Sequence, residues 1–210
     1  MNSTKERIIQ VSASLFAKKG CKSVTMDDIA GAMGMSKRTI YENFSDKKKL
    51  LTQSIEYFFN YRKDMINSAL HSSQNIIEAL FQSMQSHSNF MKDIKFDFFE
   101  EIKKYFPEVY TLTIQKFRNE NIEFSVKMLK KGQADGVFRE DIDIELTAVL
   151  MHVINNMILS QELFASYNYN KLLLSANFNF HYVRGIATEK GLKILYQYLD
   201  LFIENTKKLT

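Results

Sequence analysis

The stretch TMDDIAGAMGMSKRTIYENFSDKKKL, residues 25–50, decides the fold. Thr25 begins a T-x-x-D capping box, and this pattern predicts the start of a helix. Gly34 can adopt a positive φ at little cost, so it predicts the end of that helix. Ser36 is a favoured N-cap residue and predicts the start of another. The stretch therefore predicts two short helices joined by a tight turn.

The helix after Ser36 is predicted to have two unlike faces. At 100° per residue, Ile40 and Phe44 point to one side and can anchor the helix on its neighbours. The opposite side and the flanks carry polar and charged residues, namely Lys37, Arg38, Thr39, Tyr41, Glu42 and Asn43. A helix of this kind fits a DNA major groove about 12 Å wide, where Arg and Lys can read guanine and Asn can read adenine. A helix that served only for packing would not need this outward set.

The positive charge is concentrated in the same part of the chain. Residues 1–50 hold 10 Lys and Arg against 5 Asp and Glu, whereas residues 51–210 hold 18 against 19. A solvated basic face would explain the excess. Clustered cations bind nucleic-acid phosphates favourably because binding releases condensed counterions. The excess therefore also favours nucleic acid as the partner.

A third helix is predicted upstream, in KERIIQVSASLFAKKG, with Ile8, Ser12 and Phe16 on one stripe and Gly20 after its last turn. From about Arg7 to Leu51 the chain resembles the N-terminal domain of the TetR-family transcriptional regulators. The resemblance implies an all-α homodimer whose first three helices bind double-stranded DNA at a palindromic operator, while a larger helical domain senses a small molecule. It implies base-facing positions at Lys37, Arg38, Thr39 and Asn43, and DNA-backbone positions at Thr25, Ser36, Tyr41 and Lys47. Ser12 departs from the usual alanine, and Glu42 is an acidic residue on the DNA side.

The predicted domains are residues 1–48 for DNA binding and residues 49–210 for regulation and dimerisation. Periodicity in the second domain predicts helices at 47–65, 72–92, 93–105, from Pro107 to before Gly136, at 144–164 after an Asp143 N-cap, and after a Thr188 N-cap. For residues 166–185, where Asn and aromatic residues alternate, we expect irregular or short helical structure.

The two late helices carry two apolar stripes each, which indicates two packing partners. One partner can be the subunit core and the other the same helices of a second subunit, giving a homodimer. The predicted interface residues are Met151, Ile158, Leu192, Leu195, Leu199 and Phe202. Complete burial of both helices within one subunit is the alternative.

Aromatic and Met residues are dense between Phe81 and Phe106. They suit either a plain core or an apolar pocket for a small effector. No residue stands out as a polar anchor for that effector, although His87 and His152 are possible.

No metal, nucleotide or catalytic motif occurs, so we expect no cofactor, no metal and no enzymatic activity. The single Cys21 fits a reducing compartment and is expected at the surface. No apolar run is long enough to span a membrane, and no secretory signal is recognised, so a cytoplasmic protein is expected.

The sequence therefore predicts a DNA-binding regulator, a repressor released by a mostly apolar ligand. A regulator controlled by a partner protein, or a helical interaction module without DNA binding, are the alternatives.

Overall fold

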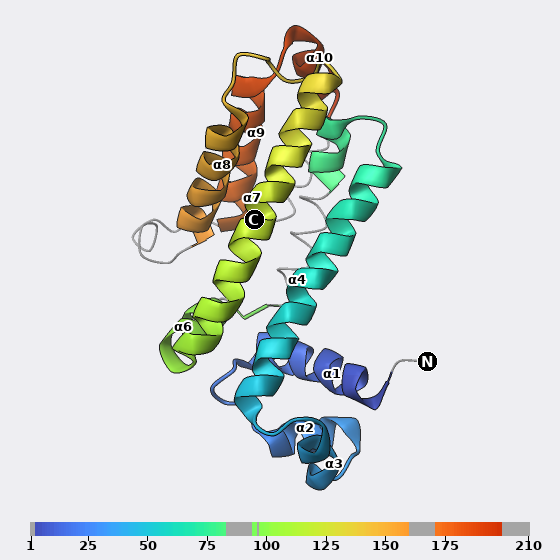
Figure 1. The fold of residues 1–210 in the computed structure, drawn as a ribbon, viewed down its shortest axis with the longest axis vertical. Coiled ribbons are helices and arrows are strands. Elements are labelled where there is room, and N and C mark those ends of the chain that lie inside the picture. Colours follow the sequence, from blue (N-terminus) through green and yellow to red (C-terminus); the bar gives the residue numbers. More distant parts are fainter. Residues whose placement is uncertain (1–2, 83–93, 96, 160–170, 199–210) are drawn as a thin grey trace. The chain divides into compact units, whose positions relative to one another are not determined.

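The computed structural model describes residues 3–82, 94–95, 97–159 and 171–198, and the residues described are overwhelmingly helical (Figure 1). The chain divides into two compact units. Unit 1 comprises residues 1–64 and 89–118, and unit 2 comprises residues 65–88 and 119–210. The helix-turn-helix stretch lies in unit 1 together with later parts of the chain. The predicted boundary between residues 48 and 49 stays a prediction.

Unit 1 begins with three helices, α1 (Thr4–Lys19), α2 (Met26–Met33) and α3 (Lys37–Asn43). Figure 1 shows α2 and α3 next to each other below α1. Unit 1 also contains the first part of α4 (Lys47–Ser72), α6 (Phe98–Tyr105) and the first part of α7 (Pro107–Ala134). Its core is formed by fully buried apolar side chains from all of these helices, among them Ile8, Phe16, Ile29, Ile40, Phe44, Leu51, Ile55, Phe98 and Val109.

The helix ends of unit 1 confirm the local signals in the sequence. The Thr25 hydroxyl accepts a hydrogen bond from Asp28 N–H, and the Asp28 carboxylate accepts one from Thr25 N–H, which completes the capping box. Gly34 follows in the left-handed conformation with φ 62°. Ser36 then caps α3 by accepting from Thr39 N–H at 3.1 Å. The two predicted helices and the turn between them are therefore confirmed.

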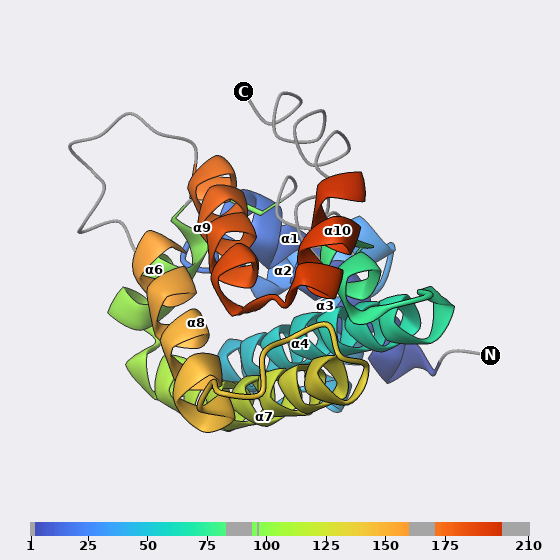
Figure 2. The same cartoon turned by 90° about the horizontal axis from the view of Figure 1, so that it is seen from above.

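Unit 2 contains the rest of α4 and α7, helical residues 76–82, and three later helices, α8 (Ile144–Leu159), α9 (Lys171–Ile186) and α10 (Glu189–Gln197). Both views show α8 and α9 side by side (Figures 1 and 2). The predicted N-caps are confirmed, because Asp143 accepts from Leu146 N–H and Thr188 accepts from Gly191 N–H.

The expectation of irregular or short helical structure at 166–185 was wrong from Lys171 onward, where α9 is a regular helix of 16 residues. One of its asparagines, Asn179, finds its partner on α8, while Asn177 donates to the Leu173 carbonyl oxygen within α9. The amide of Asn179 donates to the Asn155 oxygen at 3.0 Å, and the Ser175 hydroxyl donates to the same oxygen at 2.7 Å. Packing of Phe180 and Val183 into the unit 2 core then favours the helix over the alternating pattern.

Two helix starts were also misplaced. Residue 72 ends α4 instead of starting a helix, and the next helix follows Asn75, whose side chain accepts from Glu78 N–H at 2.9 Å. α6 begins at Phe98 rather than at residue 93. Residues 83–92 of the first predicted helix and residue 93, the predicted start of the second, lie outside the described residues.

Candidate nucleic-acid interface

Helix α3 is held by two buried residues and exposes most of its other side chains. Ile40 is 0% exposed and Phe44 1%, and both belong to the unit 1 core. On the outside, the Arg38 side chain is 88% exposed, the Lys37 side chain 55%, and Tyr41 45%. Two cationic side chains and one tyrosine are therefore exposed on a short helix that is anchored in the core by Ile40 and Phe44.

Both exposed cations are paired with acidic side chains on the surface. Lys37 Nζ lies 2.9 Å from a carboxylate oxygen of Asp27 on α2, and this contact raises the pKa of Lys37. Arg38 Nε lies 3.0 Å from Glu42 one turn along α3. Exposed pairs of this kind contribute little to stability, so either cation can exchange its carboxylate for a phosphate or a base at small cost.

The other two predicted base-facing residues are half-buried and make bonds within α3. The Asn43 amide donates to the Thr39 carbonyl oxygen at 2.8 Å. The Thr39 hydroxyl lies 2.9 Å from the hydroxyl of the capping Ser36. Before either could contact a base edge, Asn43 would have to give up its backbone bond and Thr39 its hydroxyl contact.

The predicted backbone-contacting residues divide in the same way. Thr25 and Ser36 are exposed caps whose hydroxyls already bond the chain, while Tyr41 is exposed. Lys47, at the start of α4, is half-buried. Its ammonium donates to the Lys22 carbonyl oxygen at 3.1 Å and lies 5.6 Å from the centre of the Phe106 ring. Burial lowers the pKa of Lys47.

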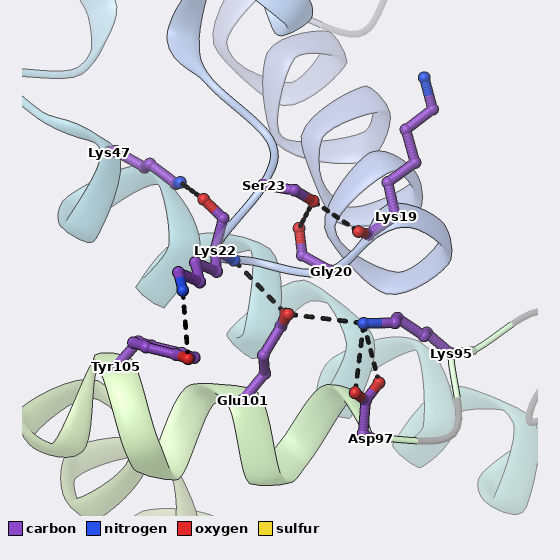
Figure 3. A network of polar contacts seen from close by, with 9 residues as sticks. All are labelled: Lys19, Gly20, Lys22, Ser23, Lys47, Lys95, Asp97, Glu101 and Tyr105. Carbon is purple, nitrogen blue, oxygen red and sulfur yellow. Dashed lines mark hydrogen bonds and ion pairs between the residues drawn. The ribbon is translucent and has the colours of Figure 1, made fainter.

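Lys47 belongs to a polar network that joins the α1–α2 turn to α6 (Figure 3). Glu101 on α6 accepts from Lys22 N–H at 3.4 Å and lies 3.5 Å from Lys95 Nζ. Lys22 Nζ in turn donates to the Tyr105 hydroxyl at 3.2 Å. We call this set the Glu101 network, and its members are Lys22, Lys47, Lys95, Asp97, Glu101 and Tyr105. Sequence reasoning missed it because Lys22 and its two partners on α6 lie about 80 residues apart and follow no local pattern.

Cys21 lies beside this network and corrects a prediction. It was expected at the surface, but its side chain is 0% exposed. Burial, reinforced by the nearby Glu101 carboxylate, raises the pKa of the thiol from 9.0 to about 12. The thiolate is the reactive form, so this cysteine is a core residue and poorly suited to redox chemistry.

The predicted dimer residues fall into three groups. Ile158 and Leu195 are 5% and 0% exposed within their own chain, so they are core positions and not available to a partner. Met151 and Leu192 are half-buried, and Leu199 and Phe202 lie outside the described residues. The exposed large apolar side chains of α8, here called the α8 stripe, are instead Leu146, Val149, Leu150 and Met157, which are between 37% and 55% exposed.

Other kinds of site find no support in the part of the chain that the structure describes. No group of three or more His, Cys, Asp and Glu side chains there could hold a metal ion. No helix within those residues is long and apolar enough to cross a membrane. Of the aromatic and methionine residues expected to line a pocket, Phe98 is fully buried in the unit 1 core, and Met84, Phe90, Met91 and Phe96 lie outside the described residues, as does His87.

Comparisons with known proteins agree with this geometry. The family model for bacterial regulatory proteins of the tetR family matches residues 8–53. The uncharacterised HTH-type transcriptional regulator YerO of Bacillus subtilis is 28% identical over 78% of this chain, which spans 59% of the length of YerO. The HTH-type transcriptional repressor KstR2 of Rhodococcus jostii is 26% identical over 66% of this chain and 70% of its own length.

Solved structures show the same fold at low identity. A transcriptional regulator from Cytophaga hutchinsonii superimposes with a TM-score of 0.74 at 18% identity, over 89% of this chain and all of its own. A regulator from Saccharomonospora viridis, solved in complex with choline, gives a TM-score of 0.70 at 19% identity, over 88% and 98% of the two chains.

Proposed function

Because the chain belongs to the TetR family of helix-turn-helix transcriptional regulators, we propose that it binds a palindromic operator as a homodimer and represses transcription until a small molecule releases it. Regulators of this family are DNA-binding proteins and not enzymes. Repression is proposed from KstR2, which is a repressor, and a small effector from the choline-bound regulator of the same fold.

The observation that carries the proposal is the geometry of α3. Ile40 and Phe44 fix the helix in the core of unit 1, while Lys37, Arg38 and Tyr41 of the same helix are exposed. We assign Lys37 and Arg38 to base edges, since long cationic side chains can read guanine. Tyr41, Lys47 and the capping hydroxyls of Thr25 and Ser36 are assigned to phosphates, which position the helix without reading sequence.

Dimerisation supplies the second half of the reading surface. Two recognition helices reach one face of DNA only when they are about 34–36 Å apart, one helical turn of the duplex. The exposed stripe of α8, which includes Leu146 and Leu150, supports an apolar interface between two subunits. An interface on a two-fold axis would make the operator palindromic.

Release would be a population shift between two dimer conformations. A ligand that binds better to the conformation with wrongly spaced α3 helices lowers operator affinity by that difference in binding free energy. Within unit 1, the Glu101 network offers a physical connection, because it bonds α6 to the turn that precedes α2. A shift of α6 would then change the support of the helix-turn-helix.

The test is to select bound fragments from genomic DNA with the purified full chain and to footprint them. The proposal requires protection of two symmetric half-sites with centres about 10 base pairs apart or a multiple of that. Fragments without a shared sequence, or protection of a single half-site by a monomer, would contradict it. Neighbouring genes in the selected fragments would suggest effectors, and each can be tested for release of the bound operator.

A further inference from the structure

The inner stripe of α4 contains a cation where its spacing calls for an apolar residue. Leu51 and Ile55 are 0% and 2% exposed, and Phe58 and Phe59 continue the stripe in the core of unit 1. Arg62 comes next, seven residues after Ile55 and seven before Ala69, which is also buried. At 3.6 residues per turn, this register places Arg62 on the same face as Ile55.

In the part of the chain that the structure describes, no acidic or polar side chain is bonded to this guanidinium. Its Nε atom is buried and makes no hydrogen bond, and no ion pair of Arg62 occurs in the described part of the chain. Arg139, by contrast, is bound by the Asp141 carboxylate, and Arg38 by Glu42. Burial alone lowers the pKa of Arg62, without an acidic neighbour to oppose it. Arg62 as a whole is half-buried, but a cationic donor such as its Nε that is buried without a partner is costly, so its presence needs an explanation.

The surroundings on the preceding turn of α4 are aromatic. The Phe59 ring stacks on Phe117 of α7 with centroids 4.1 Å apart, and the Phe58 ring meets the edge of Phe98 at 6.3 Å. These rings can cover an apolar body but offer no acceptor to the guanidinium. A partner for Arg62 must therefore bring its own negative charge and tolerate apolar neighbours.

We propose that Arg62 anchors the carboxylate of a small, otherwise apolar organic acid. A guanidinium fits a carboxylate through two parallel N–H···O bonds, so one arginine suffices to bind a monoanion. A phosphate monoester carries more charge and would leave part of it unpaired at a single arginine. Calling this ligand the effector rests on the proposed function, whereas the binding site itself does not. Arg62 is then the polar anchor that the sequence did not reveal.

The test compares matched ten-carbon probes by calorimetry on the full chain without DNA. Sodium decanoate is the carboxylate, decyl phosphate the alternative anion and 1-decanol the neutral control, each below its aggregation concentration. The variants are Arg62→Met and Arg62→Lys. Arg118→Met, at an exposed position of α7, is the matched control for the loss of one guanidinium.

We expect the wild-type chain to bind decanoate at least about tenfold more tightly than decanol, since charge-assisted hydrogen bonds distinguish the two. Arg62→Met should abolish that preference, Arg62→Lys should retain part of it, and Arg118→Met should leave it unchanged. Without ligand, Arg62→Met should melt at the same temperature as the wild type or higher, because it removes an uncompensated charge.

Three results would overturn the proposal. They are equal affinity for decanoate and decanol, a preference for decyl phosphate, and a preference that survives in Arg62→Met. A large fall in the melting temperature of ligand-free Arg62→Met would also overturn it, since Arg62 would then have a structural partner in solution. These readouts involve no operator. If decanoate binds through Arg62 but does not weaken operator binding, the site stands and the proposed effector mechanism fails.

Discussion

Gly20 is the point at which the Glu101 network constrains the backbone most severely. It ends α1 with φ 90° and ψ 147°, a region that is almost exclusive to glycine. A Cβ atom added there would lie 2.5 Å and 2.9 Å from the two carboxylate oxygens of Glu101. Gly20→Ala therefore combines a strained backbone with a collision against the central residue of the network.

The two effects have different magnitudes. Holding a non-glycine residue in this backbone conformation costs about 1–3 kcal/mol. Displacing the Glu101 carboxylate lengthens its contacts with Lys22 N–H and Lys95, which are already 3.4 Å and 3.5 Å long. Losing such contacts costs roughly 1 kcal/mol. We therefore expect Gly20→Ala to lower the free energy of unfolding by about 2–4 kcal/mol.

Gly31→Ala is the matched control. Gly31 lies inside α2, and a Cβ atom there meets nothing within 4 Å. Alanine at a helix interior is more favourable than glycine, so this variant should be more stable by about 0.5–1 kcal/mol. The same substitution of glycine by alanine is thus expected to lower the free energy of unfolding at Gly20 and to raise it at Gly31.

Urea unfolding of both variants, with and without Glu101→Ala, separates the two effects as a double-mutant cycle. Glu101→Ala should relieve the collision and leave the backbone strain. If Gly20→Ala costs less than about 0.5 kcal/mol, both parts of the reasoning are wrong, because strain alone should exceed that value. If its cost disappears entirely beside Glu101→Ala, the backbone strain is refuted and only the collision remains.

Two further predictions concern the buried thiol and the α8 stripe. The folded state keeps the Cys21 proton up to a pKa of about 12, whereas the unfolded chain releases it near 9.0, so the free energy of unfolding should fall as pH rises from 9.0 toward 12. Calorimetric melts should show this slope in the wild type and lose it in Cys21→Ala; an equal slope in both would exclude the thiol as its source. Leu150→Glu should leave the subunit folded and convert dimer to monomer in sedimentation, because Leu150 is 43% exposed. Leu195→Glu should unfold the subunit because Leu195 is fully buried, and a dimer that survives Leu150→Glu would exclude this stripe as the interface.

The helix-turn-helix and most helix ends could be predicted because their signals are local. The capping box at Thr25, the turn at Gly34 and the cap at Ser36 depend on residues at most three apart. Asp143 and Thr188 predict α8 and α10 for the same reason. Each of these signals acts before tertiary packing is formed.

The features that were missed depend on contacts between distant residues. The alternating segment of α9 is helical because Asn155 on another helix satisfies Asn179. Glu101 meets the Lys22 backbone across 79 positions of sequence. Arg62 could be noticed in the sequence, since it interrupts the apolar register of Ile55 and Phe59. That interruption becomes informative only because the structure shows the Arg62 Nε atom buried without a hydrogen bond.

The measurement that tests the central claim most directly is titration of two variants against the selected operator and a scrambled duplex at several salt concentrations. Arg38→Ala should weaken operator binding by about 1–3 kcal/mol and leave scrambled DNA almost unaffected, because Arg38 is assigned to base edges. Lys47→Ala should weaken both duplexes alike and reduce the slope of log affinity against log salt by about 0.9, the contribution of one phosphate contact. Lys127→Ala, an exposed lysine of α7, is the control and should change neither. Equal weakening of both duplexes by Arg38→Ala would make Arg38 a phosphate contact, and binding unchanged in both variants would contradict α3 as the DNA-reading surface.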